Sequence, residues 1–130
     1  MKHNILVVDD DEDDRHFMVS SFNPDNFEVT SVENGEQAFS AIFTQQFTKR
    51  PFDLLITDVE MPLIGGVELV KLLCYEKIWL PTIVVSGSIR PQVREQLTIY
   101  ENLNFMAKPV DEVELLNKVE LLLYRGANTL

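Results

Sequence analysis

Five polar residues whose side chains could take part in catalysis or metal binding follow short apolar runs at widely separated points of the chain. The run ILVV is followed by Asp9 and Asp10, LLIT by Asp58, TIVV by Ser86, and FMA by Lys108. Three carboxylates held close together repel one another, and carboxylate oxygens are ligands that Mg²⁺ prefers. An aspartate can accept a phosphoryl group, while an amine and a hydroxyl can bind the phosphoryl oxygens. The set therefore has the parts needed for metal-dependent phosphoryl transfer to an aspartate.

Apolar runs typical of β-strands alternate with helical patterns along the whole chain. Strands are predicted at 5–8, 27–32, 54–57, 82–85 and 104–107. Helices are predicted at about 13–22, 35–47, 66–75, 91–100 and 110–124. The order βαβαβαβαβα, with runs that are almost entirely apolar, predicts a parallel sheet covered by helices on both faces. Because parallel strands end on the same edge of a sheet, the five polar residues are expected to meet there.

Composition limits the classes of function. The chain has 130 residues, of which 45% are hydrophobic, which suits a single domain with one packed core. Its net charge of −10 repels phosphate backbones and anionic lipids, so we expect no direct binding to nucleic acid. No apolar run approaches the ~20 residues of a transmembrane helix, and the single cysteine, Cys74, cannot form an internal disulfide. A cytoplasmic protein without membrane insertion is therefore expected.

Four motifs lie at the ends of the predicted strands. They are ILVVDDDEDD, DLLITDVEMPLIGG, PTIVVSGS and FMAKPV, in this order and at this spacing. Together they resemble the receiver domain of bacterial two-component response regulators, over a stretch from about Asn4 to Tyr124. The resemblance implies an α/β, flavodoxin-like (βα)5 three-layer sandwich whose five-stranded parallel sheet has the order 2-1-3-4-5. It also implies a receiver domain over residues 1–125 and a short C-terminal tail at 126–130.

The same resemblance assigns roles to the acidic residues at the predicted edge. Asp58 would be the phosphoacceptor, and Asp10 and Asp58 would bind Mg²⁺ directly. The backbone carbonyl of Glu60 would be a third ligand of the ion, and Asp9 would act largely through water. The remaining acids of the run, 11–14, would form the loop and first turn of a helix, where the helix dipole favours negative charge.

Residues in or directly after the last two predicted strands would bind the phosphoryl group and change conformation when it is present. By the resemblance, Ser86 would hydrogen-bond the phosphoryl group and Lys108 would pair with it, and the bond from Lys108 to Pro109 would be cis. Phe105 lies where the family often has a tyrosine that changes rotamer on activation. A switch made of Ser86 and Phe105 would therefore work through packing, without a phenolic hydrogen bond.

The implied function is that of a signalling switch and not of an enzyme. A histidine kinase or histidine phosphotransfer protein would phosphorylate the chain, which would then bind an unknown downstream protein, and a phosphorylation-dependent homodimer is left open. One alternative is a degenerate receiver that acts as a constitutive interaction module. Another is a phosphatase of the haloacid-dehalogenase type with Asp9 as its nucleophile, although its Asp-x-Asp-x-Thr or Asp-x-Asp-x-Val pattern fails because Asp13 occupies the last position.

Overall fold

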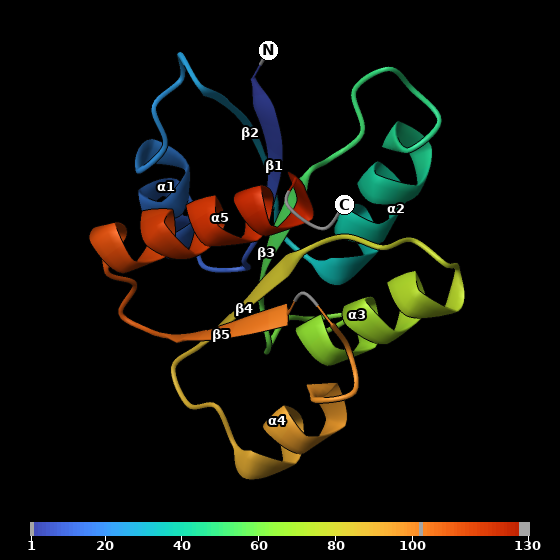
Figure 1. Ribbon diagram of the computed structural model, residues 1–130. Helices are drawn as coiled ribbons and strands as arrows, with labels where there is room; N and C mark the ends of the chain where they lie inside the picture. Colours follow the sequence, from blue (N-terminus) through green and yellow to red (C-terminus); the bar gives the residue numbers. More distant parts are fainter. Residues whose placement is uncertain (1, 102, 128–130) are drawn as a thin grey trace.

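Five parallel strands and five helices alternate along the chain in the computed structural model, which describes residues 2–101 and 103–127 (Figure 1). The strands are β1 (His3–Val8), β2 (Phe27–Val32), β3 (Leu54–Asp58), β4 (Thr82–Ser86) and β5 (Leu103–Ala107). The helices are α1 (Glu12–Ser20), α2 (Gly35–Gln45), α3 (Gly66–Tyr75), α4 (Pro91–Leu97) and α5 (Glu112–Ala127). All neighbouring strands pair in parallel in the order β2-β1-β3-β4-β5, which confirms the predicted flavodoxin-like fold.

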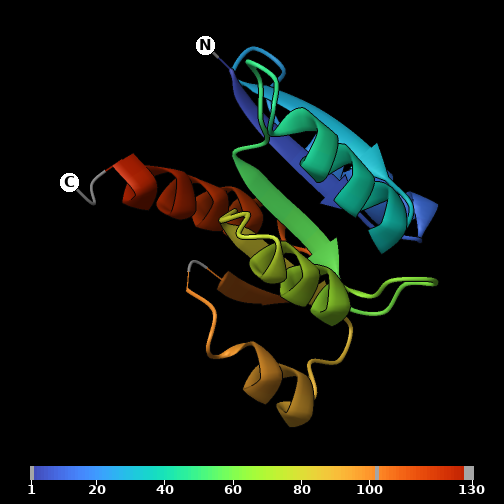
Figure 2. The same ribbon diagram turned by 90° about the vertical axis from the view of Figure 1, so that its right-hand side faces the viewer.

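The apolar run of β1 is continuous because the strand is covered on both faces. Ile5 and Val7 pack with α1 and α5, whereas Leu6 and Val8 pack with α2 and α3, and all four side chains are fully buried. Figure 2 shows the central strands with α5 on one side and α2 and α3 on the other. Edge strand β2 instead alternates half-buried and exposed residues along most of its length, as expected for a strand with one neighbour. Three layers therefore hold the C-terminal ends of the central strands in fixed positions.

The helix ends differ by a few residues from those predicted. Helix α4 stops at Leu97, three residues before the predicted end, and Tyr100 packs on the core from the turn that follows. Helix α5 continues to Ala127, so the first two residues of the predicted tail at 126–130 are helical, and 128–130 lie outside the described residues. None of the described helices has the length and hydropathy to cross a membrane.

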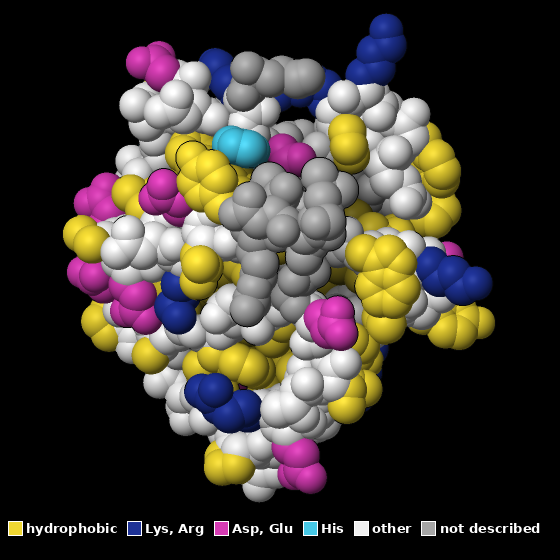
Figure 3. All heavy atoms as spheres, in the orientation of Figure 1, with side chains coloured by type: hydrophobic (Ala, Val, Ile, Leu, Met, Phe, Trp, Pro, Cys, Tyr) yellow, Lys and Arg dark blue, Asp and Glu magenta, His cyan; other side chains and the backbone are white. Residues whose placement is uncertain are grey.

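Acidic side chains gather on the side of the molecule where α5 begins, at the left of Figure 3. Glu112 and Glu114 lie in the first turn of this helix and are exposed. Negative charge near a helix N-terminus is favoured by the aligned peptide dipoles. The exposed acids at the start of α5 therefore stabilise this helix.

Candidate functional site

Three carboxylates from two strand ends meet at the C-terminal edge of the sheet. Asp9 and Asp10 follow β1, and Asp58 is the last residue of β3, the strand that pairs with β1. One carboxylate oxygen from each residue can be chosen so that all three lie within 4.8 Å of one another. Asp9 and Asp58 are buried and Asp10 is exposed. The sequence-based expectation that these acids converge therefore agrees with the geometry.

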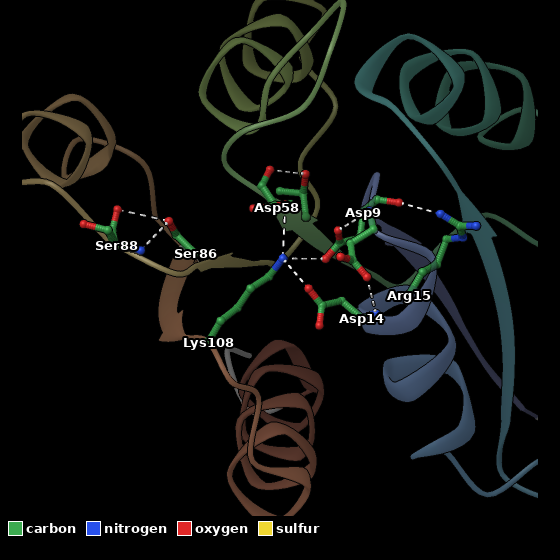
Figure 4. A network of polar contacts seen from close by, with 9 residues as sticks. Asp9, Asp14, Arg15, Asp58, Ser86, Ser88 and Lys108 are labelled. Atoms are coloured by element: carbon green, nitrogen blue, oxygen red, sulfur yellow. Dashed lines mark hydrogen bonds and ion pairs between the residues drawn. The ribbon is translucent and has the colours of Figure 1, made fainter.

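Lys108 extends from the end of β5 into this cluster (Figure 4). Its Nζ lies 2.9 Å from Asp9 Oδ2 and 3.2 Å from Asp58 Oδ2. The backbone N–H of Lys108 donates to the carbonyl of Ser86 at 2.9 Å, which fixes where the side chain starts, and the bond to Pro109 is cis as the resemblance implied. The amine is thus held beside the carboxylate that would accept a phosphoryl group.

The electrostatics of the cluster follow from burial and proximity. Burial raises the pKa of Asp58 above its ordinary value, the charge of Asp9 raises it further, and Lys108 only partly offsets both effects. Burial alone would lower the pKa of Lys108, but its contacts with the surrounding carboxylates outweigh burial and raise that pKa. Lys108 is therefore cationic at neutral pH, and the ionised form of Asp58 is stabilised less well than an exposed aspartate.

The carboxylate of Asp9 has spare capacity for a cation. Its side chain is fully buried, and Oδ1 accepts a hydrogen bond from the backbone N–H of Asp11 at 2.9 Å. Oδ2 lies 2.9 Å from the ammonium of Lys108 and has no further polar partner within the described residues. One cationic partner leaves lone pairs on this buried oxygen, which a second cation or a water molecule can use. The acid cluster thus fits a hard divalent cation such as Mg²⁺.

Glu60 lies on the loop after β3, where it lines the same groove as Asp10. Its side chain points to another partner, since its Oε1 pairs with Nη2 of Arg90 at 3.1 Å. The Glu60 carboxylate is therefore engaged by the loop before α4, and the backbone carbonyl remains the group that the resemblance offers to a metal ion.

The two residues expected to form the switch lie on β4 and β5, and neither has a hydrogen bond to Asp58 among the described residues. Ser86 is buried at the end of β4, and its Oγ donates to the carbonyl of Ser88 and accepts from the N–H of Ser88, both at 3.1 Å. Phe105 is half-buried on β5 and packs among core residues of α3 and α4. The guanidinium of Arg94 lies over its ring, 4.5 Å from the centroid.

Two residues of α1 belong to the site and were not predicted. Asp14 Oδ2 lies 2.9 Å from Lys108 Nζ, and the side chain of Arg15 donates to the backbone carbonyl of Asp9 at 2.8 Å. In the sequence, Asp14 is hidden in a run of six acids. The sequence does contain a signal for this position of Asp14, because the apolar Met18 follows it by four residues and the two therefore share one face of a helix. In the structure Met18 is fully buried, so this face is the one that packs on the core.

The chain belongs to the response regulator receiver domain family, whose sequence model matches residues 5–120. Among curated relatives, it is 27% identical to the response regulator receiver protein CpdR of Brucella abortus, over 92% of this chain and 95% of CpdR. It is 30% identical to the protein RcaC of Microchaete diplosiphon, over 90% of this chain but only 18% of RcaC. The fold superposes with a TM-score of 0.81 on the receiver domain of the Francisella response regulator 1452, at 25% identity over 96% of this chain and 99% of that one.

Proposed function

We propose that Asp58 accepts a phosphoryl group from a histidine kinase or a histidine phosphotransfer protein, in a step that depends on Mg²⁺. The observation that supports this most directly is the meeting of Asp9, Asp10 and Asp58 with the ammonium of Lys108 at one edge of the sheet. A carboxylate oxygen of Asp58 attacks the phosphorus, the bond from phosphorus to the donor imidazole nitrogen breaks, and the imidazole leaves and takes up a proton.

In this proposal Asp10, Asp58 and the backbone carbonyl of Glu60 hold Mg²⁺ directly, and Asp9 acts largely through water. The ion would supply positive charge for the phosphoryl oxygens. The assignment is supported by the carboxylate oxygens of the three aspartates, which can lie within 4.8 Å of one another.

Lys108 and Ser86 would bind the transferred phosphoryl group. The ammonium of Lys108 already lies 3.2 Å from Asp58, so it would pair with a phosphoryl oxygen without a large rearrangement. The hydroxyl of Ser86 would have to leave its two contacts with Ser88 in order to donate to the phosphoryl group. This exchange of partners would couple phosphorylation to the loop that precedes α4.

The signal would leave through the surface formed by α4 and β5. Phe105 lies on β5 under the guanidinium of Arg94, a residue of α4, so a shift of the loop after Ser86 would change how ring and guanidinium pack. Phe105→Ala should therefore change partner binding more than phosphorylation. Equal loss of both activities would show that Phe105 supports the site and not a switch.

The output would be a change in protein binding, and not catalytic turnover or binding to DNA. A net charge of −10 opposes contact with a phosphate backbone, and the lone Cys74 fits a reducing cytoplasm. A haloacid-dehalogenase-type phosphatase with Asp9 as its nucleophile is disfavoured because Asp13 stands where its pattern requires Thr or Val. A degenerate receiver is disfavoured because an acid cluster, a lysine and a hydroxyl all stand at the edge.

The test is the intact mass of the protein after incubation with acetyl phosphate, with and without Mg²⁺, alongside Asp58→Asn. We expect one phosphoryl adduct that requires Mg²⁺ and is absent from the variant. An adduct of equal yield in Asp58→Asn would refute the assignment of the acceptor. A chain that forms no adduct under any condition would favour the constitutive interaction module.

A further inference from the structure

Lys108 has a third carboxylate partner that lies outside the group suited to a metal ion. Asp14 Oδ2 is 2.9 Å from the ammonium, as close as Asp9 and closer than Asp58 (Figure 4). Asp14 belongs to α1 and is 43% exposed, whereas the side chains of Asp9 and Asp58 are 0% and 10% exposed. The ammonium therefore bridges two buried acids and one acid at the rim.

The two buried acids have competing partners. Asp9 and Asp58 belong to the set whose oxygens can surround a divalent cation, and the same two residues contact Lys108. Asp14 contacts Lys108 but does not belong to that set within the described residues. When the buried oxygens turn toward a cation, Asp14 is the carboxylate that stays available to the ammonium, which is itself repelled by the added positive charge.

We propose that Asp14 is a positioning residue that holds the ammonium of Lys108 beside Asp58 while Asp58 engages Mg²⁺ directly and Asp9 engages it largely through water. This inference rests on the proposed function, because it assumes that the acid cluster binds the ion. Asp14 touches neither the ion nor the acceptor and acts only through Lys108. Without it, Lys108 has only Asp9 and Asp58 as partners and competes with the ion for them.

The start of α1 is built so that Asp14 is held in place. The carboxylate of Asp11 caps the helix and accepts the backbone N–H of Asp14 at 3.0 Å. One residue further on, Arg15 donates to the carbonyl of Asp9 at 2.8 Å, which ties the helix to the end of β1. Met18, one turn later, is fully buried in the core. These contacts leave the first turn little freedom to move away from Lys108.

The experiment compares Mg²⁺ affinity in the full chain, measured by two-dimensional NMR, for the unaltered protein, Asp14→Asn and Asp13→Asn. Asp13 is the matched control because it is an exposed acid in the same first turn and makes no ion pair within the described residues. We expect Asp14→Asn to weaken Mg²⁺ binding about fivefold and Asp13→Asn less than about twofold. Asp14→Glu, which keeps the carboxylate, should restore part of the affinity.

A double-mutant cycle with Lys108→Met separates positioning from simple charge. If Asp14 acts through Lys108, then Asp14→Asn should change Mg²⁺ affinity less than about twofold once Lys108 is methionine. Equal losses with and without Lys108 would overturn the proposal, because they would mean that Asp14 acts on the ion by charge alone. Losses for Asp14→Asn no larger than those for Asp13→Asn would overturn it as well.

A second readout does not depend on the folding of Lys108→Met. In the Mg²⁺-loaded protein, the ammonium signal of Lys108 should persist in the nitrogen-15 spectrum of the unaltered chain and of Asp13→Asn, and disappear in Asp14→Asn through exchange with water. Persistence in Asp14→Asn would overturn the proposal. If the unaltered chain fails to bind Mg²⁺, both the metal part of the proposed function and the role of Asp14 are refuted. If the unaltered chain binds Mg²⁺ and Asp14→Asn has no effect, only the role of Asp14 is refuted.

Discussion

Replacing Lys108 with methionine should destabilise the protein strongly, although it removes one charged group from a half-buried position. The ammonium contacts three carboxylates, and only 18% of the Lys108 side chain is exposed. Methionine matches the length and most of the volume of lysine, so the packing of the alkyl chain is largely kept. What is lost is the positive charge among Asp9, Asp14 and Asp58.

The expected loss follows from the burial of the partners. Removing one member of a buried ion pair costs roughly 3–5 kcal/mol, because the other charge stays buried without compensation. The contact with Asp14 adds little, since an exposed pair contributes about 0–1 kcal/mol. Asp58, whose pKa is already raised, can take up a proton and relieve part of the repulsion. We therefore expect the lower limit, about 3 kcal/mol, which lowers Tm by roughly 10 °C for a chain of this length.

The assay is urea unfolding at neutral pH, followed by circular dichroism. The matched control is Lys118→Met, because within the described residues Lys118 makes only a 4.0 Å pair with the half-exposed Glu114 on the same helix and should contribute about 0.5 kcal/mol or less. Saturating Mg²⁺ should recover part of the stability of Lys108→Met, since binding to the folded state stabilises it. Equal stabilities of Lys108→Met and Lys118→Met would show that the ammonium of Lys108 does not stabilise the buried carboxylates.

Three further substitutions test other parts of the site. Because the pKa of Asp58 is raised, its ionised form lowers the stability of the fold at neutral pH, and Asp58→Asn should therefore raise Tm at that pH. This gain in Tm should disappear as the pH falls below the ordinary pKa of 3.8, and a gain independent of pH would contradict the prediction. Asp11→Ala removes the cap of α1 and should cost about 1 kcal/mol in urea unfolding, with an unchanged stability counting against the cap. Gly66→Ala places a Cβ against the backbone carbonyl oxygen of Asp58, so it should impair both folding and phosphorylation by acetyl phosphate. Gly87→Ala places a Cβ that meets nothing within 4 Å, so it should leave both unchanged.

The pattern of apolar runs was sufficient to predict a parallel sheet between two layers of helices because the central strands are buried on both faces. A strand covered by helices on both sides must be apolar at every position, and ILVV, LLIT and TIVV satisfy this almost completely. The position of the acid cluster followed from the same pattern, since the residue after each buried run lies at the C-terminal edge. The strand order, by contrast, was expected from the family resemblance, because apolar runs do not reveal which strand lies beside which.

Side-chain partners were harder to predict than positions. The contact between Lys108 and Asp14 depends on how α1 and the end of β5 lie relative to each other across 94 residues of sequence, which no local pattern encodes. The Arg94 guanidinium lies over Phe105 because α4 packs against β5, and a charged residue in an exposed helix gives no sign of such a partner. Ser86 was expected to serve the phosphoryl group, but in this structure its hydroxyl bonds the backbone of Ser88, a local contact that position alone does not predict.

The most direct test of the account is to identify the residue that carries the phosphoryl group. The protein is treated with acetyl phosphate and Mg²⁺, reduced with borohydride, which converts an aspartyl phosphate to homoserine, and analysed by peptide mass spectrometry. If Asp58 is the acceptor, homoserine is expected at Asp58 and at no other acid of the cluster. Homoserine at Asp9, or its absence from every peptide of a fully folded sample, would contradict the assignment of Asp58 as the acceptor.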